Sequence, residues 1–296
     1  MLKSFDHYPL KVLHLESTDI CQASCPLCAR ENDLSFDKNA RNSLTVDDIK
    51  SLLDANIIKN LDKMFMCGTY GDPAANKHSI EIYEYFRKIN PDIVLGMNTN
   101  GAIQNTVWWR QIGQIMHQPQ DYVVFSIDGL EDTNHIYRRG VNWQKLMENA
   151  ESYISTGASA HWDMLIYEHN EHQVDACKQL AKDMGFSWFR AKVSKRKHSI
   201  EWLRPPKSYK QDIEVKTNQI KCNSTQEQSI YISADKRLFP CCWLANDDQY
   251  PLAKYAEIAS TWNTDYCVPK CKKNCGIVEY QTNNFENQFK IEEQLR

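Results

Sequence analysis

The chain has 296 residues, of which 42% are hydrophobic, so it can form one large domain or a large domain with a small annex. Its formal net charge of −3 implies no strong electrostatic field that would attract nucleic acids or membranes. No stretch approaches about 18 consecutive apolar residues, and the N-terminus lacks the apolar segment of a signal peptide. We therefore expect a cytoplasmic protein that does not bind a membrane.

Predicted strands and helices alternate over the first 193 residues. The strands are expected at residues 11–17, 63–67, 92–97, 122–127, 160–167 and 187–193. Helical periodicity lies between them, at residues 46–53, 79–89, 107–116, 143–154 and 171–184. This alternation favours a parallel sheet, and six units are too few for a closed eightfold barrel.

The remaining third of the chain has a different composition. A basic run at residues 195–198 and the pair Pro205–Pro206 predict a solvated linker. A cysteine-rich annex runs from Cys222 to Gly276, and the last twenty residues predict a terminal helix or a tail. We expect one domain at residues 1–200 and a second at residues 201–296.

Three cysteines, Cys21, Cys25 and Cys28, follow the first predicted strand with spacings of three and two residues. The chain has 11 cysteines, which in a cytosolic protein favours metal binding over disulfides. Four thiolates are the usual ligands of a 4Fe–4S cluster, so three leave one iron open to a small molecule. The alternative is zinc, but no fourth Cys or His closely follows Cys28.

This cysteine motif resembles that of the radical S-adenosylmethionine (SAM) superfamily, although Leu27 replaces the usual aromatic residue before the third cysteine. The resemblance implies an α/β fold, a partial (β/α)6 TIM-like barrel. It also implies SAM and a 4Fe–4S cluster held by the three cysteines as cofactors.

Residues after the second and third strands resemble SAM-binding motifs of that superfamily. The segment Gly68-Thr-Tyr-Gly-Asp-Pro73 is similar to its Gly-Gly-Glu-Pro motif, which implies that Gly71, Asp72 and Pro73 contact the SAM amino group. Asn100 lies in a Thr-Asn-Gly sequence that the family also carries. Both segments are also ordinary turn sequences.

Further candidate SAM contacts follow the fourth and fifth strands. The segment from Ser126 through Asp128 to Arg138 resembles a Ser-x-Asp-Gly and His-x-x-x-Arg pattern of SPASM and twitch-domain radical SAM enzymes. The resemblance implies that Ser126 and Arg138 bind the SAM carboxylate, which suits a guanidinium fork. Asn170 lies where the family often has an asparagine near the SAM ribose. The alternative for the Arg138 segment is a capping loop with a surface arginine.

Six further cysteines lie in the annex, and a predicted hairpin at residues 229–240 separates the first two. The layout resembles a twitch domain, a shortened SPASM domain with one auxiliary 4Fe–4S cluster. The resemblance implies four ligands: Cys222, Cys241, Cys271 and Cys275. Cys242 and Cys267 are alternates, and a structural zinc ribbon is the competing hypothesis.

The resemblance also implies the chemistry. A donor such as flavodoxin or ferredoxin reduces the first cluster, SAM is cleaved to a 5′-deoxyadenosyl radical, and that radical abstracts hydrogen from a small molecule or peptide. The auxiliary cluster makes a two-electron oxidation the expected outcome, with Asp247 or Asp248 as candidate base. Competing hypotheses are a radical SAM RNA-modifying enzyme, against which the modest net charge argues, and a non-enzymatic zinc-binding interaction protein.

Overall fold

Strands and helices alternate along the chain up to residue 193, as the sequence predicts. The computed structural model describes residues 9–194, 200–207, 214–245, 247–280 and 290–295. The strands are β1 (Val12–Leu15), β2 (Lys63–Met66), β3 (Val94–Thr99), β4 (Tyr122–Ser126), β5 (Ala160–Ile166), β6 (Trp188–Val193), β7 (Glu214–Ile220), β8 (Ser229–Ile232), β9 (Leu238–Phe239), β10 (Gly276–Tyr280) and β11 (Lys290–Gln294). The α-helices are α1 (Ala29–Asn32), α2 (Val46–Leu52), α3 (Ala55–Lys59), α4 (Ser79–Ile89), α5 (Thr106–Ile115), α6 (Glu131–Tyr137), α7 (Trp143–Ile154), α8 (Val174–Met184), α9 (Asn223–Glu227), α10 (Tyr255–Ser260) and α11 (Pro269–Cys275).

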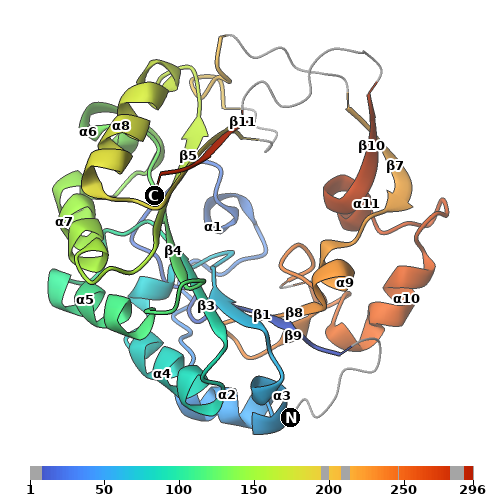
Figure 1. Cartoon of the computed structure of the whole chain (residues 1–296). Coiled ribbons are helices and arrows are strands. Elements are labelled where there is room, and N and C mark those ends of the chain that lie inside the picture. The colour runs from blue at the N-terminus through green and yellow to red at the C-terminus, as the bar shows by residue number, and fades with distance from the viewer. Residues whose placement is uncertain (1–8, 195–199, 208–213, 246, 281–289, 296) are drawn as a thin grey trace.

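Most strands join one sheet of nine, in the order β11-β6-β5-β4-β3-β2-β1-β8-β9. Each neighbouring pair from β1 to β6 is parallel. The sheet curves into an arc, and α4, α5, α7 and α8 lie on its outer side (Figure 1). The predicted partial (β/α)6 barrel is therefore confirmed, because helical connections between parallel strands place the helices on one face.

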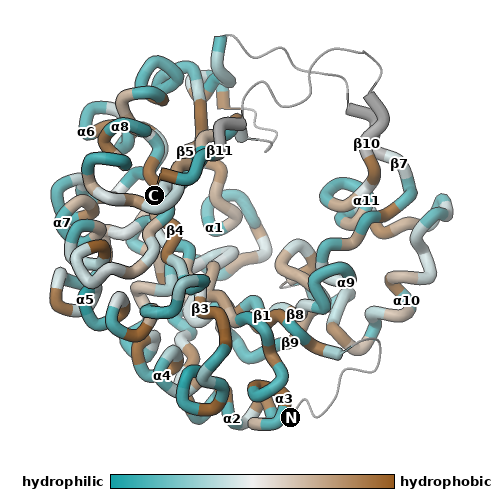
Figure 2. Tube along the Cα trace, in the orientation of Figure 1, coloured by the Kyte–Doolittle hydropathy of each residue, from teal (hydrophilic) through white to brown (hydrophobic). Residues whose placement is uncertain are grey.

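The two faces of the sheet differ because successive side chains of a strand point to opposite sides. In β5, Trp162 and Met164 point toward the helices and are buried, whereas His161 and Asp163 face the concave side and are only half-buried. The outer helices alternate hydrophilic and hydrophobic segments along their turns, as helices with one buried face do (Figure 2). The apolar core thus lies between sheet and helices, and the concave face keeps polar groups.

Local sequence signals set several helix ends. Thr45 and Asp48 form a capping box at the start of α2, with the Asp48 N–H donating to the Thr45 hydroxyl at 3.2 Å. Helix α4 ends at Ile89, two residues before Pro91, as predicted.

The C-terminal third extends the sheet at both edges. Strand β8 pairs in parallel with β1 and antiparallel with β9, which confirms the predicted hairpin. Strands β7 and β10 form a separate antiparallel pair. The predicted terminal helix or tail is wrong for residues 290–294, because β11 pairs antiparallel with β6. The predicted linker at residues 195–198 lies outside the described residues, and the division into two domains near residue 200 stays a prediction.

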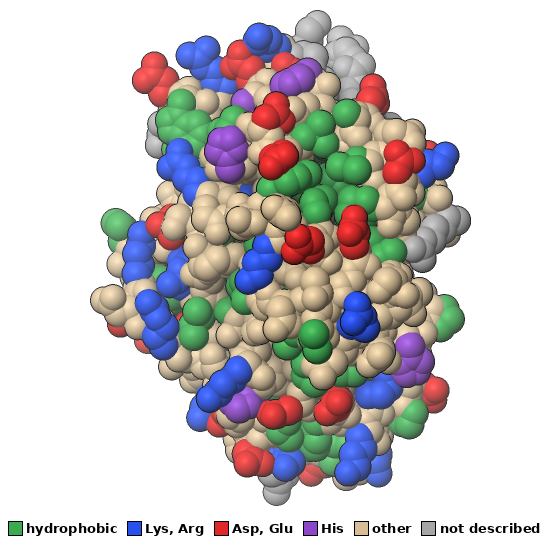
Figure 3. All heavy atoms as spheres, turned by 90° about the vertical axis from the view of Figure 1, so that its left-hand side faces the viewer, with side chains coloured by type: hydrophobic (Ala, Val, Ile, Leu, Met, Phe, Trp, Pro, Cys, Tyr) green, Lys and Arg blue, Asp and Glu red, His purple; other side chains and the backbone are tan. Residues whose placement is uncertain are grey.

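The outer surface gives two further observations. Basic and acidic side chains are interspersed on the helical face shown in Figure 3, without a broad field of either sign. In the described ranges, none of the helices combines the length and apolar character that crossing a membrane requires.

Candidate functional site

The three cysteines of the predicted first cluster lie in the loop between β1 and α1, at the carboxyl end of β1. Cys25 is buried, and Cys21 and Cys28 are half-buried. The Cys28 N–H donates to the Cys25 carbonyl oxygen at 3.0 Å and closes a tight turn. The Ala23 N–H donates to the Cys21 sulfur at 3.4 Å. The loop therefore collects three thiols and supplies a backbone donor to one of them.

Arg138 lies between a buried carboxylate and a cysteine of this loop. Its Nε donates to Asp128 Oδ2 at 2.6 Å, and its Nη1 lies 3.9 Å from the Cys25 sulfur. Asp128 is fully buried, and its other oxygen accepts the Leu165 N–H at 2.6 Å. A guanidinium held in this way places positive charge beside the cysteine loop.

The glycine-rich loop after β2 carries a carboxylate that is turned inward. Asp72 is buried and accepts hydrogen bonds from the Thr99 hydroxyl at 2.9 Å and from the Asn100 N–H at 2.7 Å. The Asn100 amide also lies 3.8 Å from the Cys21 sulfur, and its oxygen accepts the Gln22 side-chain amide at 2.7 Å. The structure thus joins the predicted SAM residues Asp72 and Asn100 to the cysteine loop in one network.

Two other predicted contacts lie at the same edge of the sheet. Asn170 is fully buried and donates to the Asp128 and Leu165 carbonyl oxygens, each at 2.9 Å, while its own oxygen accepts the Tyr167 N–H at 2.7 Å. Its amide is therefore committed to the Asp128 turn. Ser126 is half-buried, and within the described part of the chain its hydroxyl makes no hydrogen bond. Both roles in SAM binding stay predictions.

Glu16 is a functional candidate that the sequence reasoning missed. Its side chain is buried at the end of β1, and Oε1 accepts the Tyr70 N–H at 2.6 Å and the Gly71 N–H at 3.3 Å. Oε2 accepts the Tyr231 hydroxyl of β8 at 2.5 Å. Burial raises the pKa of Glu16 to about 7, although these hydrogen bonds oppose the rise. Glu16 was hard to find because Tyr231 lies 215 residues away along the chain.

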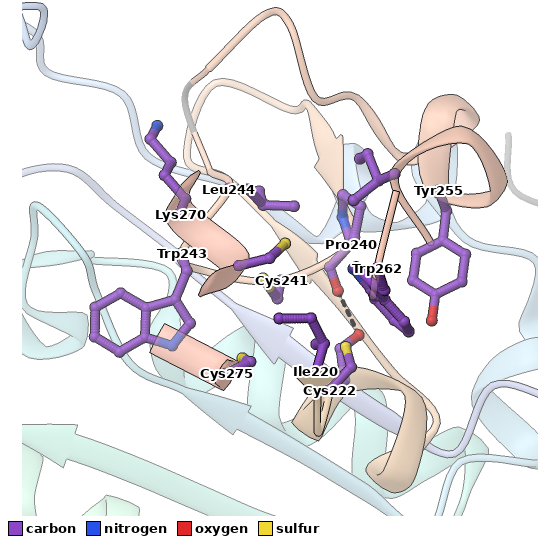
Figure 4. A pocket seen from close by; sticks show the side chains of 13 residues that line it. Ile220, Cys222, Pro240, Cys241, Trp243, Leu244, Tyr255, Trp262, Lys270 and Cys275 are labelled. Atoms are coloured by element: carbon purple, nitrogen blue, oxygen red, sulfur yellow. Dashed lines mark hydrogen bonds between the residues drawn. The ribbon is translucent and has the colours of Figure 1, made fainter. Parts of the chain in front are cut away.

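Four annex cysteines line one pocket in the structure (Figure 4). They are the four predicted auxiliary ligands, Cys222, Cys241, Cys271 and Cys275. The alternates lie elsewhere: Cys242 packs against Tyr231 and Phe239, and the buried Cys267 is not among the lining residues.

The chemistry of this cysteine pocket fits a bound cation. Burial raises the pKa of Cys241 to about 11. Burial also raises the pKa of Cys271 to about 12, and Cys241 adds to the rise, whereas the neighbouring Trp262 indole lowers it. The buried Trp262 N–H therefore lies within reach of the Cys271 sulfur as an acceptor, and no oxygen of the described residues competes for it. Thiols in such surroundings ionise only when a positive centre binds them.

A family model described as the radical SAM superfamily matches residues 15–181, which is more than half of the chain. The chain belongs to the radical SAM superfamily. A search of curated proteins finds no match.

Several solved structures share the fold of this chain. The chain is similar to SuiB of Streptococcus suis bound to S-adenosylmethionine, with a TM-score of 0.61, 12% identity, and 89% of this chain and 68% of SuiB covered. It is also similar to anSMEcpe with bound AdoMet and Cp18Cys peptide, with a TM-score of 0.58, 13% identity, and coverage of 88% and 81%. The likeness extends beyond residue 181 into the annex, in agreement with the SPASM/twitch resemblance.

Membership implies SAM and a 4Fe–4S cluster, and the cysteine loop of this radical SAM protein fits that group. Burial raises the pKa of Cys21 to about 12, and the Asp72 carboxylate adds to the rise. The thiolate therefore needs a cationic partner such as iron. The polar hydrogens of Ala23, Asn100 and Arg138 already point at the cysteine sulfurs, as hydrogen bonds to cluster ligands require.

The candidate bases occupy ion pairs at the surface of the annex. Asp247 lies 2.7 Å from the Lys270 ammonium. Burial opposes ionisation of Asp247, but the hydrogen bonds from Lys270 and the Gln249 N–H and the charge of Lys270 together outweigh it and hold the pKa below its usual value. Asp248 is exposed and pairs with Arg237. A carboxylate with a lowered pKa is a weaker base, and the role of either residue stays a prediction.

Proposed function

We propose that this protein cleaves SAM reductively and abstracts a hydrogen atom from a substrate held inside the partial barrel. The observation that carries the proposal is the convergence of Cys21, Cys25 and Cys28 in one loop of a chain of the radical SAM superfamily. The sulfurs of Cys21 and Cys25 already face polar hydrogens. When bound, the cluster supplies the electron that splits SAM into methionine and a 5′-deoxyadenosyl radical.

The residues around this loop would bind and orient SAM. The backbone of the loop from Gly71 to Pro73 would accept hydrogens of the SAM amino group, because the Asp72 side chain is already committed to Thr99 and Asn100. The hydroxyl of Ser126 would hold the SAM carboxylate, together with those N–H groups of Arg138 that do not contact Asp128.

The annex would hold one auxiliary 4Fe–4S cluster on Cys222, Cys241, Cys271 and Cys275. The shared pocket of these four thiols supports this ligand set over one that includes Cys242 or Cys267. Such a cluster would accept the electron that remains on the substrate, so the net reaction would be a two-electron oxidation.

The substrate would be a peptide or a small molecule. SuiB has been solved bound to the precursor peptide SuiA, and anSMEcpe with a Cp18Cys peptide, which supports a peptide for this fold. Electron supply by flavodoxin or ferredoxin and a cytoplasmic location complete the proposal.

The decisive test is anaerobic. The protein is reconstituted with iron and sulfide, mixed with dithionite and SAM, and analysed for 5′-deoxyadenosine by chromatography. We expect product from the wild type and none from a variant in which Cys21, Cys25 and Cys28 are all alanine. A wild type that binds zinc, takes up no iron and makes no product would refute the proposal.

Metal analysis tests the auxiliary ligands separately. We expect about eight irons per wild-type chain and about four after Cys222→Ala or Cys275→Ala, because each replacement removes one cluster ligand. Cys267→Ala is the matched control and should retain the full iron content. Loss of iron in Cys267→Ala with none in Cys275→Ala would overturn the ligand assignment.

A further inference from the structure

The concave face of the sheet holds a polar cavity that neither SAM nor either proposed cluster is expected to occupy. The cavity has a volume of about 400 Å³, within the range of small-molecule sites. It is lined by strands β3 to β6, chiefly through Asn98, Tyr122, His161, Asp163, Trp188 and Arg190.

Strand register places two residues of this cavity level with the candidate SAM residue Ser126. Ser126 is opposite Asp163, and Asp163 is opposite Arg190, so these three side chains form one row across the concave face. His161 is opposite Trp188 in the next row, farther from the carboxyl ends of the strands. One end of the cavity therefore reaches the row that contains Ser126, although Ser126 itself is not among the lining residues. Tyr122, His161 and Trp188 lie toward the amino ends of their strands.

Hydrogen-bond donors dominate the groups that the cavity presents. In the portion of the chain that the structure describes, the Tyr122 hydroxyl, the Trp188 indole N–H and the Asn98 amide have no hydrogen-bond partner. Lys63, on the adjoining strand β2, is not among the lining residues, but its ammonium lies 4.7 Å from the centre of the Tyr122 ring that lines the cavity and 5.1 Å from that of Phe65. No carboxylate among the described residues forms an ion pair with Lys63, so this ammonium faces the concave side without an acidic partner.

The one carboxylate that lines the cavity is already neutralised. The Asp163 carboxylate accepts hydrogen bonds from Arg190 Nε, at 2.8 Å, and from Arg190 Nη2. The Lys192 ammonium lies 4.0 Å from the same carboxylate. His161 is uncharged near neutral pH because burial lowers its pKa to about 4. Glu227 acts on Lys63 only through its charge at a distance, and burial lowers the pKa of Lys63. An acidic or acceptor-rich ligand would satisfy these donors, whereas a cationic ligand would find no free carboxylate.

We propose that this cavity binds an oxyanion of the substrate, a carboxylate or a phosphate, with Lys63 as the main counter-ion and the Tyr122, His161 and Trp188 rings beside the rest of the molecule. The inference rests on the proposed function only in calling the ligand a substrate. Either source of the oxyanion satisfies the same donors, and the test separates them.

Binding of simple probes tests this without SAM, reductant or turnover. Benzoate, phenyl phosphate and the neutral isostere benzamide are titrated into the anaerobic cluster-loaded protein, and binding is followed by saturation-transfer NMR of the probe. We expect the two anions to bind and benzamide to bind at least about tenfold more weakly, since charge-assisted hydrogen bonds are the stronger ones. The tighter of the two anions identifies the oxyanion.

Variants at one position separate charge from shape. Lys63→Met keeps the apolar stem and removes the charge, and it should weaken both anions by about tenfold. Lys63→Arg should retain binding within about threefold. Lys59→Met, on the exposed surface of α3, is the matched control and should change nothing. Thermal unfolding verifies that each variant is folded.

Two results would overturn the inference: equal binding of benzamide and the anions, or unchanged anion binding in folded Lys63→Met. The enzyme does not turn over any of the probes, so a failure to form 5′-deoxyadenosine would not affect the binding measurement. Conversely, SAM cleavage with normal yield in a protein that binds no anion refutes the cavity assignment and leaves the proposed function standing.

Discussion

Glu16 joins the glycine-rich loop to β8, and its replacement should change how stability depends on pH. The carboxylate is buried and accepts hydrogen bonds from the Tyr70 and Gly71 N–H groups and the Tyr231 hydroxyl. Burial raises its pKa from 4.5 to about 7. We therefore expect Glu16→Gln, which keeps the shape and cannot titrate, to remove one pH-dependent contribution to folding.

The sign and size follow from proton linkage. The folded state keeps the Glu16 proton up to about pH 7, whereas the unfolded chain loses it near 4.5. The stability due to protonated Glu16 is fully present below 4.5 and is lost as the pH rises to about 7. At about 1.4 kcal/mol per pKa unit, the wild type should lose about 3 kcal/mol of unfolding free energy relative to Glu16→Gln across this range.

Urea unfolding of both cluster-loaded proteins, at several pH values between about 5 and 8, measures the difference between their unfolding free energies. Contributions common to both proteins cancel in it, including the clusters and the other titrating groups. A difference that stays constant across the range would refute the reasoning. Glu16→Ala is a second probe: it leaves three donors without an acceptor and should cost about 3–6 kcal/mol near pH 5. This cost should shrink as the pH rises to about 7, because the wild type loses its own Glu16 contribution there.

Three further predictions concern the site and its support. In Gly71→Ala the new Cβ would lie 1.9 Å from the Thr18 carbonyl oxygen, so the glycine-rich loop after β2 must shift. Equilibrium dialysis should therefore show that the affinity for SAM is lowered about tenfold. Arg138→Ala leaves the buried Asp128 unpaired, so denaturant unfolding should show a loss of about 3–5 kcal/mol, while a loss below about 1 would contradict the buried pair. Burial lowers the pKa of His14 from 6.5 to about 4; stability relative to His14→Gln should therefore fall by about 3 kcal/mol as the pH drops through this window, again measured by urea unfolding.

Local patterns were enough to predict the barrel units. Helix α7 and helix α4 begin and end where the apolar periodicity places them, because each has one face buried against the sheet. The cysteine spacing indicated the first loop, and the hairpin-flanking positions of Cys222 and Cys241 indicated two thiols that now line one pocket.

Local sequence patterns could not predict the pairing of strands that lie far apart along the chain. The polar composition of the C-terminal segment predicts a helix or an irregular tail. Residues 290–294 nevertheless form strand β11, because they pair with the open edge of β6. The alternation of polar residues such as His161 and Asp163 in β5 is also typical of a solvated strand face. Only the curvature of the sheet turns that face into a cavity, and no signal within one strand specifies curvature.

The pairing of β8 with β1 bears on how the two candidate clusters are held. The cysteine loop directly follows β1, and Cys241 follows β9, whose partner β8 pairs with β1. The two sets of thiols are thus connected through two strand pairings, and the Glu16–Tyr231 hydrogen bond crosses the same junction. Transfer of the substrate's electron to the proposed auxiliary cluster would need a fixed separation between the two sets of thiols, and backbone hydrogen bonds fix it better than a linker does. A chain truncated before β8 would therefore lose more than four thiols. It would expose the β1 edge and leave buried Glu16 without one of its donors, and for both reasons we expect the truncated barrel to be less stable even with its own cluster bound.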